Sequence, residues 1–144
     1  MKKINIRKEL IDDKIKNIRD SLGIIEENLP DSLESFMQIG LIKDGIYKKI
    51  EFLIESIVDI CAIINSDLNL GSPETEDSII EHLERKKIFS KKTVSLIQEM
   101  KKFRNILVHR YGKINDAQAF ETIKEGLDDF EVIVGEIEAF LKKY

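Results

Sequence analysis

The sequence predicts an all-α protein, a single domain built as an up-and-down bundle of four to five helices. In several long segments, apolar residues recur at alternating spacings of three and four, the period of an amphipathic helix. No segment shows the convincing alternation of a half-buried strand. No repeat and no linker divides the 144 residues, a length that suits one domain over residues 1–144 with its own core.

The first expected helix carries an apolar stripe from Ile11 to Leu29, and Pro30 ends it because proline cannot continue a helix. Asp31, with Glu34 three residues later, resembles a capping box and predicts a short second helical segment.

The remaining helices are expected at about 46–68, 77–85, 91–109 and 117–141, with a loop at 69–73. Ser90 is the expected N-cap of the helix that ends near 109, and Gly112 offers its stop. Asp116 is the expected cap of the last helix. The narrow apolar stripes of these helices can be buried internally or against a second copy of the chain, and the stripes alone leave both arrangements open.

Composition is that of an ordinary soluble protein, with 42% hydrophobic and 35% charged residues. No apolar run approaches the roughly 18 residues of a membrane span. The N-terminus becomes charged again before the apolar core of a signal peptide could form, so we expect a cytoplasmic location. Cys61, the single cysteine, lies in an apolar helical stretch and is expected to be a buried thiol.

The net charge of −4 hides a strong asymmetry along the chain. Residues 85–113 carry ten basic side chains and one acidic side chain, while the segments on either side are acidic. Such a concentration is typical of an anion-binding face. It can equally complement the acidic helices of the chain or of a partner, and charge alone does not separate these readings.

Several common kinds of site are excluded. With two histidines and one cysteine, no spacing gathers the ligands of a metal. A glycine-rich phosphate loop and a nucleophilic serine elbow are also missing, so no metal and no cofactor are expected. His82 is expected on an exposed helical face without a functional role.

Glu51, Glu55 and Asp59 recur every four residues and therefore share one face of their helix. Paired carboxylates can act as acid and base, but a solvated face is the commoner meaning of this pattern. Asp59 is flanked by apolar residues, where burial would require a charged partner. An arginine from the 104–110 region is a candidate for that partner.

The stretch "FRNILVHRYG", residues 103–112, concentrates the versatile side chains of the protein. Arg104 and His109 are five residues apart, which separates them by about 140° around a continuous helix. We therefore expect them to converge only where the helix frays or turns near His109, or where two chains bring their copies together.

Arginine grips a phosphate through two hydrogen bonds, and histidine exchanges a proton near neutral pH. Such a pair suffices in principle to cleave RNA without a metal, with the 2′-hydroxyl as the internal nucleophile. A structural role, with Arg104 paired to Asp59 and His109 at a helix end, is the competing interpretation.

"RNILVHRY" resembles the Arg-x4-His-x-Tyr motif of the HepT toxins, a branch of the HEPN superfamily, through Arg104, His109 and Tyr111. "IEFLIESIVDICAII" resembles the second helix of that family, and "MKKFRNILVHRYGKIND" resembles its motif helix and the following loop. The likeness covers roughly residues 40–140.

This resemblance implies a homodimeric bundle in which two motifs line a shared basic cleft. It implies a metal-independent endoribonuclease, the toxin of a toxin–antitoxin pair, with Arg104 and His109 catalytic. Asn105, Glu55 and Asp59 would be supporting residues. Lys101, Lys102 and Arg110 are expected to bind RNA.

The resemblance also implies a protein partner, an MntA-type minimal nucleotidyltransferase antitoxin. This antitoxin would silence the toxin by transferring AMP onto Tyr111, because a bulky anion there would block an RNA cleft. The alternative is a non-catalytic HEPN module that binds a nucleotide or a nucleotidyltransferase partner through the same basic segment.

Overall fold

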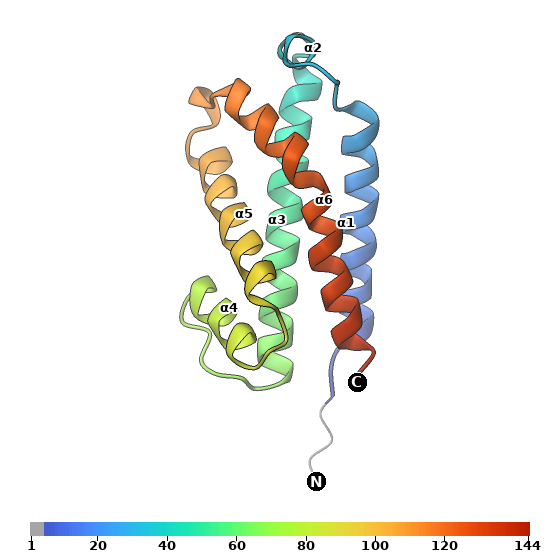
Figure 1. The fold of residues 1–144 in the computed structure, drawn as a ribbon, viewed down its shortest axis with the longest axis vertical. Helices are drawn as coiled ribbons and strands as arrows, with labels where there is room; N and C mark the ends of the chain where they lie inside the picture. Colours follow the sequence, from blue (N-terminus) through green and yellow to red (C-terminus); the bar gives the residue numbers. More distant parts are fainter. Residues whose placement is uncertain (1–4) are drawn as a thin grey trace.

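The computed structural model describes residues 5–144, except for the side chain of Tyr111, and this range is helical without a strand. Figure 1 shows the arrangement. The helices are α1 (Lys8–Asn28), α2 (Leu33–Gln38), α3 (Leu41–Asp67), α4 (Glu76–Arg85), α5 (Lys91–His109) and α6 (Asp116–Leu141), with a 3-10 turn at Tyr111–Lys113.

The four long helices α1, α3, α5 and α6 run alternately up and down, as predicted (Figure 1). Helix α3 packs against α1, α4 and α5, and α6 packs against α1 and α5. Short α2 covers one end of the bundle, and α4 lies beside α3 and α5 toward the other. The all-α bundle prediction is confirmed.

The apolar stripes meet in one core because each helix repeats its apolar residues at the helical period. In α1 the stripe includes Ile11, Ile18 and Ile25, all fully buried, and in α3 it includes Ile57 and Ile60. Cys61 is fully buried, as predicted, and burial raises the pKa of its thiol to about 12. None of the helices in residues 5–144 is long and apolar enough to cross a membrane.

Two predicted helix caps are wrong by one residue. Ser32, not Asp31, caps α2 by accepting from the Ser35 backbone N–H. The cap of α6 is Asn115, whose side chain accepts from the Gln118 backbone N–H at 3.1 Å. The Ser90 cap of α5 is confirmed, because its hydroxyl accepts from the Thr93 N–H.

Asp116 instead joins the starts of α3 and α6. Its carboxylate accepts hydrogen bonds from the Tyr47 hydroxyl at 2.5 Å and from Lys43 Nζ at 2.8 Å. Helix α3 begins at Leu41, five residues earlier than predicted, because the break after α2 is confined to Ile39 and Gly40, with Gly40 at φ +52°. Gly45 lies within α3.

His82 is half-buried, so its predicted exposed position is wrong. Its Nδ1 lies 2.9 Å from Asn65 Oδ1, and Asn65 Nδ2 donates to the Gly71 carbonyl at 3.1 Å. His82 therefore helps to fix the loop between α3 and α4.

Candidate active site

The motif occupies the last turns of α5. The helix is continuous through His109, and the Arg110 backbone N–H donates to the Ile106 carbonyl at 3.0 Å as the C-cap. The chain then enters the 3-10 turn that starts at Tyr111. Leu107 is buried and anchors this stretch, while Val108 and His109 are exposed.

Arg104 and His109 line one open hollow of about 420 Å³ between α5, α3 and the start of α4. The other residues of its wall are Asn105, Val108, Glu55, Val58, Asp59 and Glu76. Helix α5 ends at His109, as one of the expected conditions for convergence requires, and both side chains border the hollow within one chain. The alternative that a second chain brings two copies together stays a prediction. Arg104 and His109 flank the hollow from either side of Asn105 and Val108, because a face of α5 rather than a single line of residues forms the wall.

Arg104 is held by Glu76, the first residue of α4. Arg104 Nη2 donates to Glu76 Oε1 at 2.7 Å and Nη1 donates to Oε2 at 3.3 Å. The Arg104 side chain is 12% exposed and that of Glu76 is 42% exposed. The hydrogen bonds with Glu76 raise the pKa of Arg104 further, and those from Arg104 lower the pKa of Glu76.

The pairing of Arg104 with Asp59, part of the competing structural interpretation, is thus wrong. Asp59 is exposed, and its carboxylate lies 3.6 Å from Lys14 Nζ. The helical period places it at the solvent edge of α3 although its sequence neighbours are buried. Glu55 is also exposed, and both carboxylates line the same hollow as Asn105.

Lys101 does not have the placement of an RNA-binding side chain. It is 8% exposed, forms an ion pair with Asp77, and lies 3.6 Å from Glu76 Oε1. One turn before Arg104 on the same face of α5, it packs under α4 instead of facing solvent. We therefore assign Lys101 to the frame of the site.

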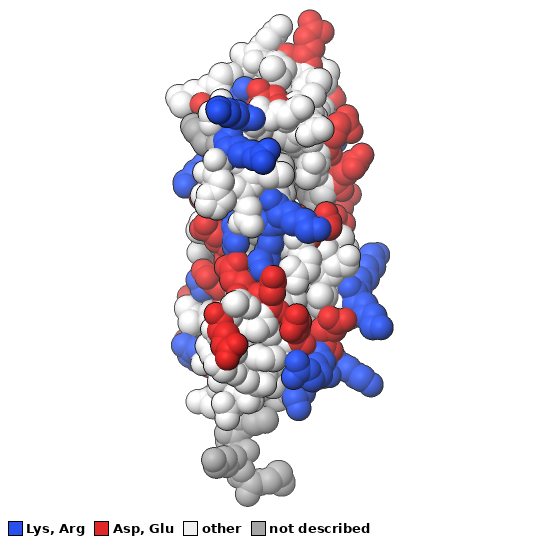
Figure 2. Space-filling view, turned by 90° about the vertical axis from the view of Figure 1, so that its left-hand side faces the viewer, with Lys and Arg blue, Asp and Glu red and all other residues white. Residues whose placement is uncertain are grey.

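Lys102 and Arg110 are exposed, as RNA contacts would require. Lys102 forms an ion pair with Glu99 one turn earlier, at 3.3 Å. Figure 2 shows basic side chains on this side of the molecule, interrupted by a patch of acidic ones. Part of the basic segment therefore complements acidic residues of α4, while the five lysines and arginines at 85–92 form no ion pair within the described residues.

Sequence reasoning missed Glu76. Its one sequence indication is the acidic pair Glu76–Asp77 ahead of a short helix, matched by Lys101 and Arg104 three residues apart. A single sequence does not say which helix faces which, so this match could not be made without the fold.

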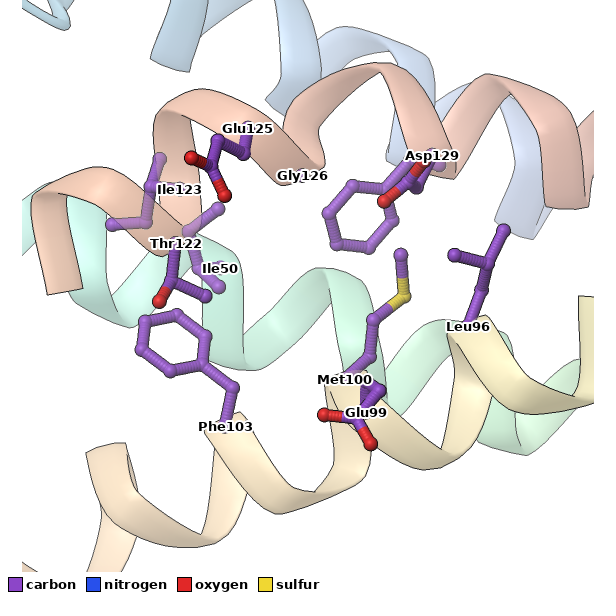
Figure 3. Close-up of a pocket in the computed structure, with 11 residues that line it drawn as sticks. Ile50, Leu96, Glu99, Met100, Phe103, Thr122, Ile123, Glu125, Gly126 and Asp129 are labelled. Carbon is purple, nitrogen blue, oxygen red and sulfur yellow. The ribbon is translucent and has the colours of Figure 1, made fainter. Parts of the chain in front are cut away.

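A second hollow, of about 240 Å³, lies on the opposite side of α5, against α6 (Figure 3). Met100 and Phe103 form its apolar wall from α5, and its charged groups are carboxylates, including Glu125 and Asp129. Because it offers no cation for a phosphate, we place no RNA contact there. Among the described residues, no group of three or more His, Cys, Asp or Glu side chains could hold a metal ion.

The described residues form the all-α bundle expected of a HEPN protein, with Arg104 and His109 bordering one hollow. A family model described as "Ribonuclease HepT-like" matches residues 18–137. The chain therefore belongs to the HepT-like ribonuclease family.

Two curated proteins are similar over most of their length. One, from Shewanella oneidensis, is named "mRNA nuclease HepT"; it is 24% identical over 91% of this chain and 98% of its own. The other, from Archaeoglobus fulgidus, is named "Putative RNase"; it is 27% identical over 83% of this chain and 84% of its own.

A solved structure agrees with the fold. It describes a tri-AMPylated Shewanella oneidensis HEPN toxin in complex with an MNT antitoxin. Its matched chain is 24% identical, with a TM-score of 0.81 over 96% of this chain and 99% of that chain.

Proposed function

We propose that this protein is the toxin of a toxin–antitoxin pair and cleaves RNA, without a metal, in the hollow between α3, α4 and α5. The observation that carries the proposal is that Arg104 and His109 line this one hollow. Arginine supplies a permanent positive charge for a phosphate, and histidine supplies a proton acceptor or donor at neutral pH.

The proposed reaction uses the 2′-hydroxyl of the RNA. This oxygen attacks the adjacent phosphorus, its proton passes to a base, and a 2′,3′-cyclic phosphate forms as the bond to the 5′-oxygen breaks. The leaving oxygen takes up a proton. His109 moves the proton, while Arg104 stabilises the negative charge that develops on the phosphate. DNA is not a substrate in this reaction because it lacks the 2′-hydroxyl.

Asn105, Glu55 and Asp59 are proposed as polar supports around the hollow, which they help to line. Lys102 and Arg110 are proposed to contact the RNA backbone outside it, because both are exposed on the same end of α5. The names of the two curated relatives, an mRNA nuclease and a putative RNase, support RNA as the substrate class.

The proposed partner is an MntA-type nucleotidyltransferase encoded with this toxin, which would transfer AMP onto Tyr111. The solved complex of an AMPylated HEPN toxin with its antitoxin supports this regulation. Tyr111 begins the 3-10 turn after α5, two residues after His109, and its side chain lies outside the described part of the structure. An added AMP would bring negative charge and bulk to a position two residues from His109.

We also propose a homodimer that joins two copies of the motif face, in the cytoplasm. Phe52 on α3 and Ile106 and Val108 on α5 are 43–45% exposed, although all three are large and apolar. They lie on the two helices that form most of the hollow, so a second copy would bury apolar surface and enclose the site.

Incubation of the purified protein with RNA and excess EDTA tests the proposal. We expect cleavage products with 2′,3′-cyclic phosphate ends and no cleavage of DNA of the same sequence. Cleavage that requires added magnesium, or products with 5′-phosphates, would contradict the proposed chemistry. Intact RNA under all these conditions would contradict the nuclease assignment itself.

A further inference from the structure

Glu76 has a fixed position at the start of α4. Thr75 and Ser78 form a capping box, in which each side chain accepts from the other residue's backbone N–H. This arrangement defines the first turn of the helix and hence the direction in which Glu76 leaves it.

The loop before α4 is tied to α3 as well. The Nδ2 of Asn65 donates to the Gly71 carbonyl, so the Oδ1 of Asn65 faces His82 and accepts a hydrogen bond from the His82 Nδ1–H. Gly71, at φ +152°, allows this close approach, since a Cβ there would lie 2.6 Å from the His82 ring. The frame that carries Glu76 is therefore joined to α3, which also forms a wall of the hollow.

The contact with Arg104 uses one edge of the guanidinium. Nη1 and Nη2 each donate to one oxygen of Glu76, which leaves the edge formed by Nε and the adjacent Nη without a carboxylate. Among the described residues, the one other hydrogen bond of Arg104 joins Nη2 to Asn105 Oδ1 at 3.5 Å. A guanidinium has five N–H donors, so Arg104 can hold Glu76 through Nη1 and Nη2 and offer a phosphate Nε, together with the Nη2 proton that now makes the long contact with Asn105.

Lys101 and Asp77 balance the charges next to this contact. The Lys101 ammonium lies between Asp77 and Glu76, so two cations of α5 meet two carboxylates of α4. Glu76 is thus secured from two sides, and Arg104 is held with little freedom because its side chain is largely buried.

We propose that Glu76 is a positioning residue for RNA cleavage, which holds the Arg104 guanidinium at the hollow with its Nε edge open to the scissile phosphate. This inference rests on the proposed nuclease function. The carboxylate itself does not touch the RNA. It restricts Arg104 to the geometry in which charge on the phosphate is stabilised, a requirement that is stricter in the transition state than in the bound ground state.

The test compares Glu76→Gln and Glu76→Asp with a control, Glu81→Gln, an exposed residue of the same helix. The cleavage rate constant is measured in single turnover, and the affinity is measured with an RNA that carries 2′-deoxyribose at the cleavage site. For Glu76→Gln we expect a rate constant lower by at least about tenfold, with affinity changed by less than about threefold. Glu76→Asp should recover part of the rate, and the control should match the wild type.

An unchanged rate in Glu76→Gln would overturn the proposal. Tighter RNA binding with an equal or faster rate would also overturn it, because Glu76 would then compete with the phosphate. A rate loss that follows the unfolded fraction, measured by circular dichroism at several temperatures, would assign Glu76 a merely structural role and overturn the proposal as well.

The Nη–Hη resonances of Arg104 give a second readout that does not depend on activity, because Glu76 accepts hydrogen bonds from Nη1 and Nη2. We expect slowly exchanging protons in the wild type and in Glu81→Gln, and fast exchange in Glu76→Gln. If the wild type holds these protons but cleaves no RNA, the proposed nuclease function fails while the contact itself stands. If the wild type cleaves RNA and Glu76→Gln alters neither the protons nor the rate, the positioning role alone fails.

Discussion

Arg104 and His109 lie at the two sides of one hollow on the final turns of α5, with Asn105 and Val108 between them. The helix is regular over this stretch, so their five-residue spacing sets the width of the site. In the proposed reaction Arg104 contacts the phosphate and His109 exchanges a proton with the ribose hydroxyl, so the two side chains act on different atoms. Both side chains border this hollow within a single chain.

Arg104→Lys should impair cleavage although it keeps the positive charge. Lysine cannot reproduce two parallel hydrogen bonds to Glu76 together with a second edge for phosphate. We expect the single-turnover rate constant to fall by about ten- to a hundredfold. Lys102→Ala is the matched control, because Lys102 is exposed on the neighbouring turn, and it should mainly weaken RNA binding. A fully active Arg104→Lys variant would show that charge alone suffices.

Asp116 should contribute to stability in a pH-dependent manner. Burial alone would raise its pKa, but the hydrogen bonds from Lys43 and Tyr47 outweigh burial and lower it. Because the folded pKa lies below the unfolded value of about 3.9, this contribution is present above that pH and is lost as pH falls through the folded pKa.

The free energy of unfolding of Asp116→Asn, measured in urea, should therefore lie below that of the wild type at pH 7. The difference should shrink as the pH falls below about 4. Asp128→Asn, at an exposed position of the same helix, provides the control and should change stability little. If Asp116→Asn lowers the free energy of unfolding by the same amount at pH 7 and at pH 3, the charged contact of Asp116 is not the source of the lost stability.

Ile57→Ala tests the core of α3. Ile57 is fully buried, and its truncation removes apolar contacts and leaves a cavity. We expect a loss of about 2–5 kcal/mol in the free energy of unfolding, measured by urea titration. Phe52→Ala on the same helix removes a larger side chain that is 44% exposed, and should cost less in the folding of a single chain. A larger loss of stability for Phe52→Ala than for Ile57→Ala would mean that Phe52 is buried in the protein as it exists in solution.

Ile106→Asp tests the proposed dimer. Ile106 is 43% exposed at the motif end of α5, so a charge there is tolerated in a single chain. In a dimer joined through this face it would be buried without a partner, and we expect monomers in sedimentation velocity. Leu10→Asp, at a similarly exposed position on α1, should leave the dimer intact. A dimer that survives Ile106→Asp and dissociates in Leu10→Asp would place the interface elsewhere.

The helical period was sufficient to predict the bundle, because the long helices carry their stripes at strict spacings of three and four. Helix ends were less predictable. Asp31 and Asp116 are good capping residues by type, but each has a neighbour, Ser32 or Asn115, that takes the cap instead. Asp116 instead accepts hydrogen bonds from Lys43 and Tyr47, which lie on another helix and therefore cannot be found from the residues next to Asp116.

Site residues that share a helix could be grouped from the sequence, since the motif is contiguous. Contacts between helices could not be predicted from the sequence. Arg104 pairs with Glu76 instead of Asp59 because α4 lies across α5 at the hollow, and Lys101 is buried for the same reason. The half-buried place of His82 likewise depends on the path of the loop at Gly71.

Replacement of His109 tests the central claim most directly. His109 is exposed at the end of α5, so His109→Ala should keep the helicity and the unfolding midpoint of the wild type. In single-turnover cleavage of RNA with EDTA present, we predict that its rate constant falls by about a hundredfold or more, while affinity for RNA is retained. Glu81→Gln, at an exposed position outside the hollow, should still cleave. Cleavage by His109→Ala at the wild-type rate would contradict the account.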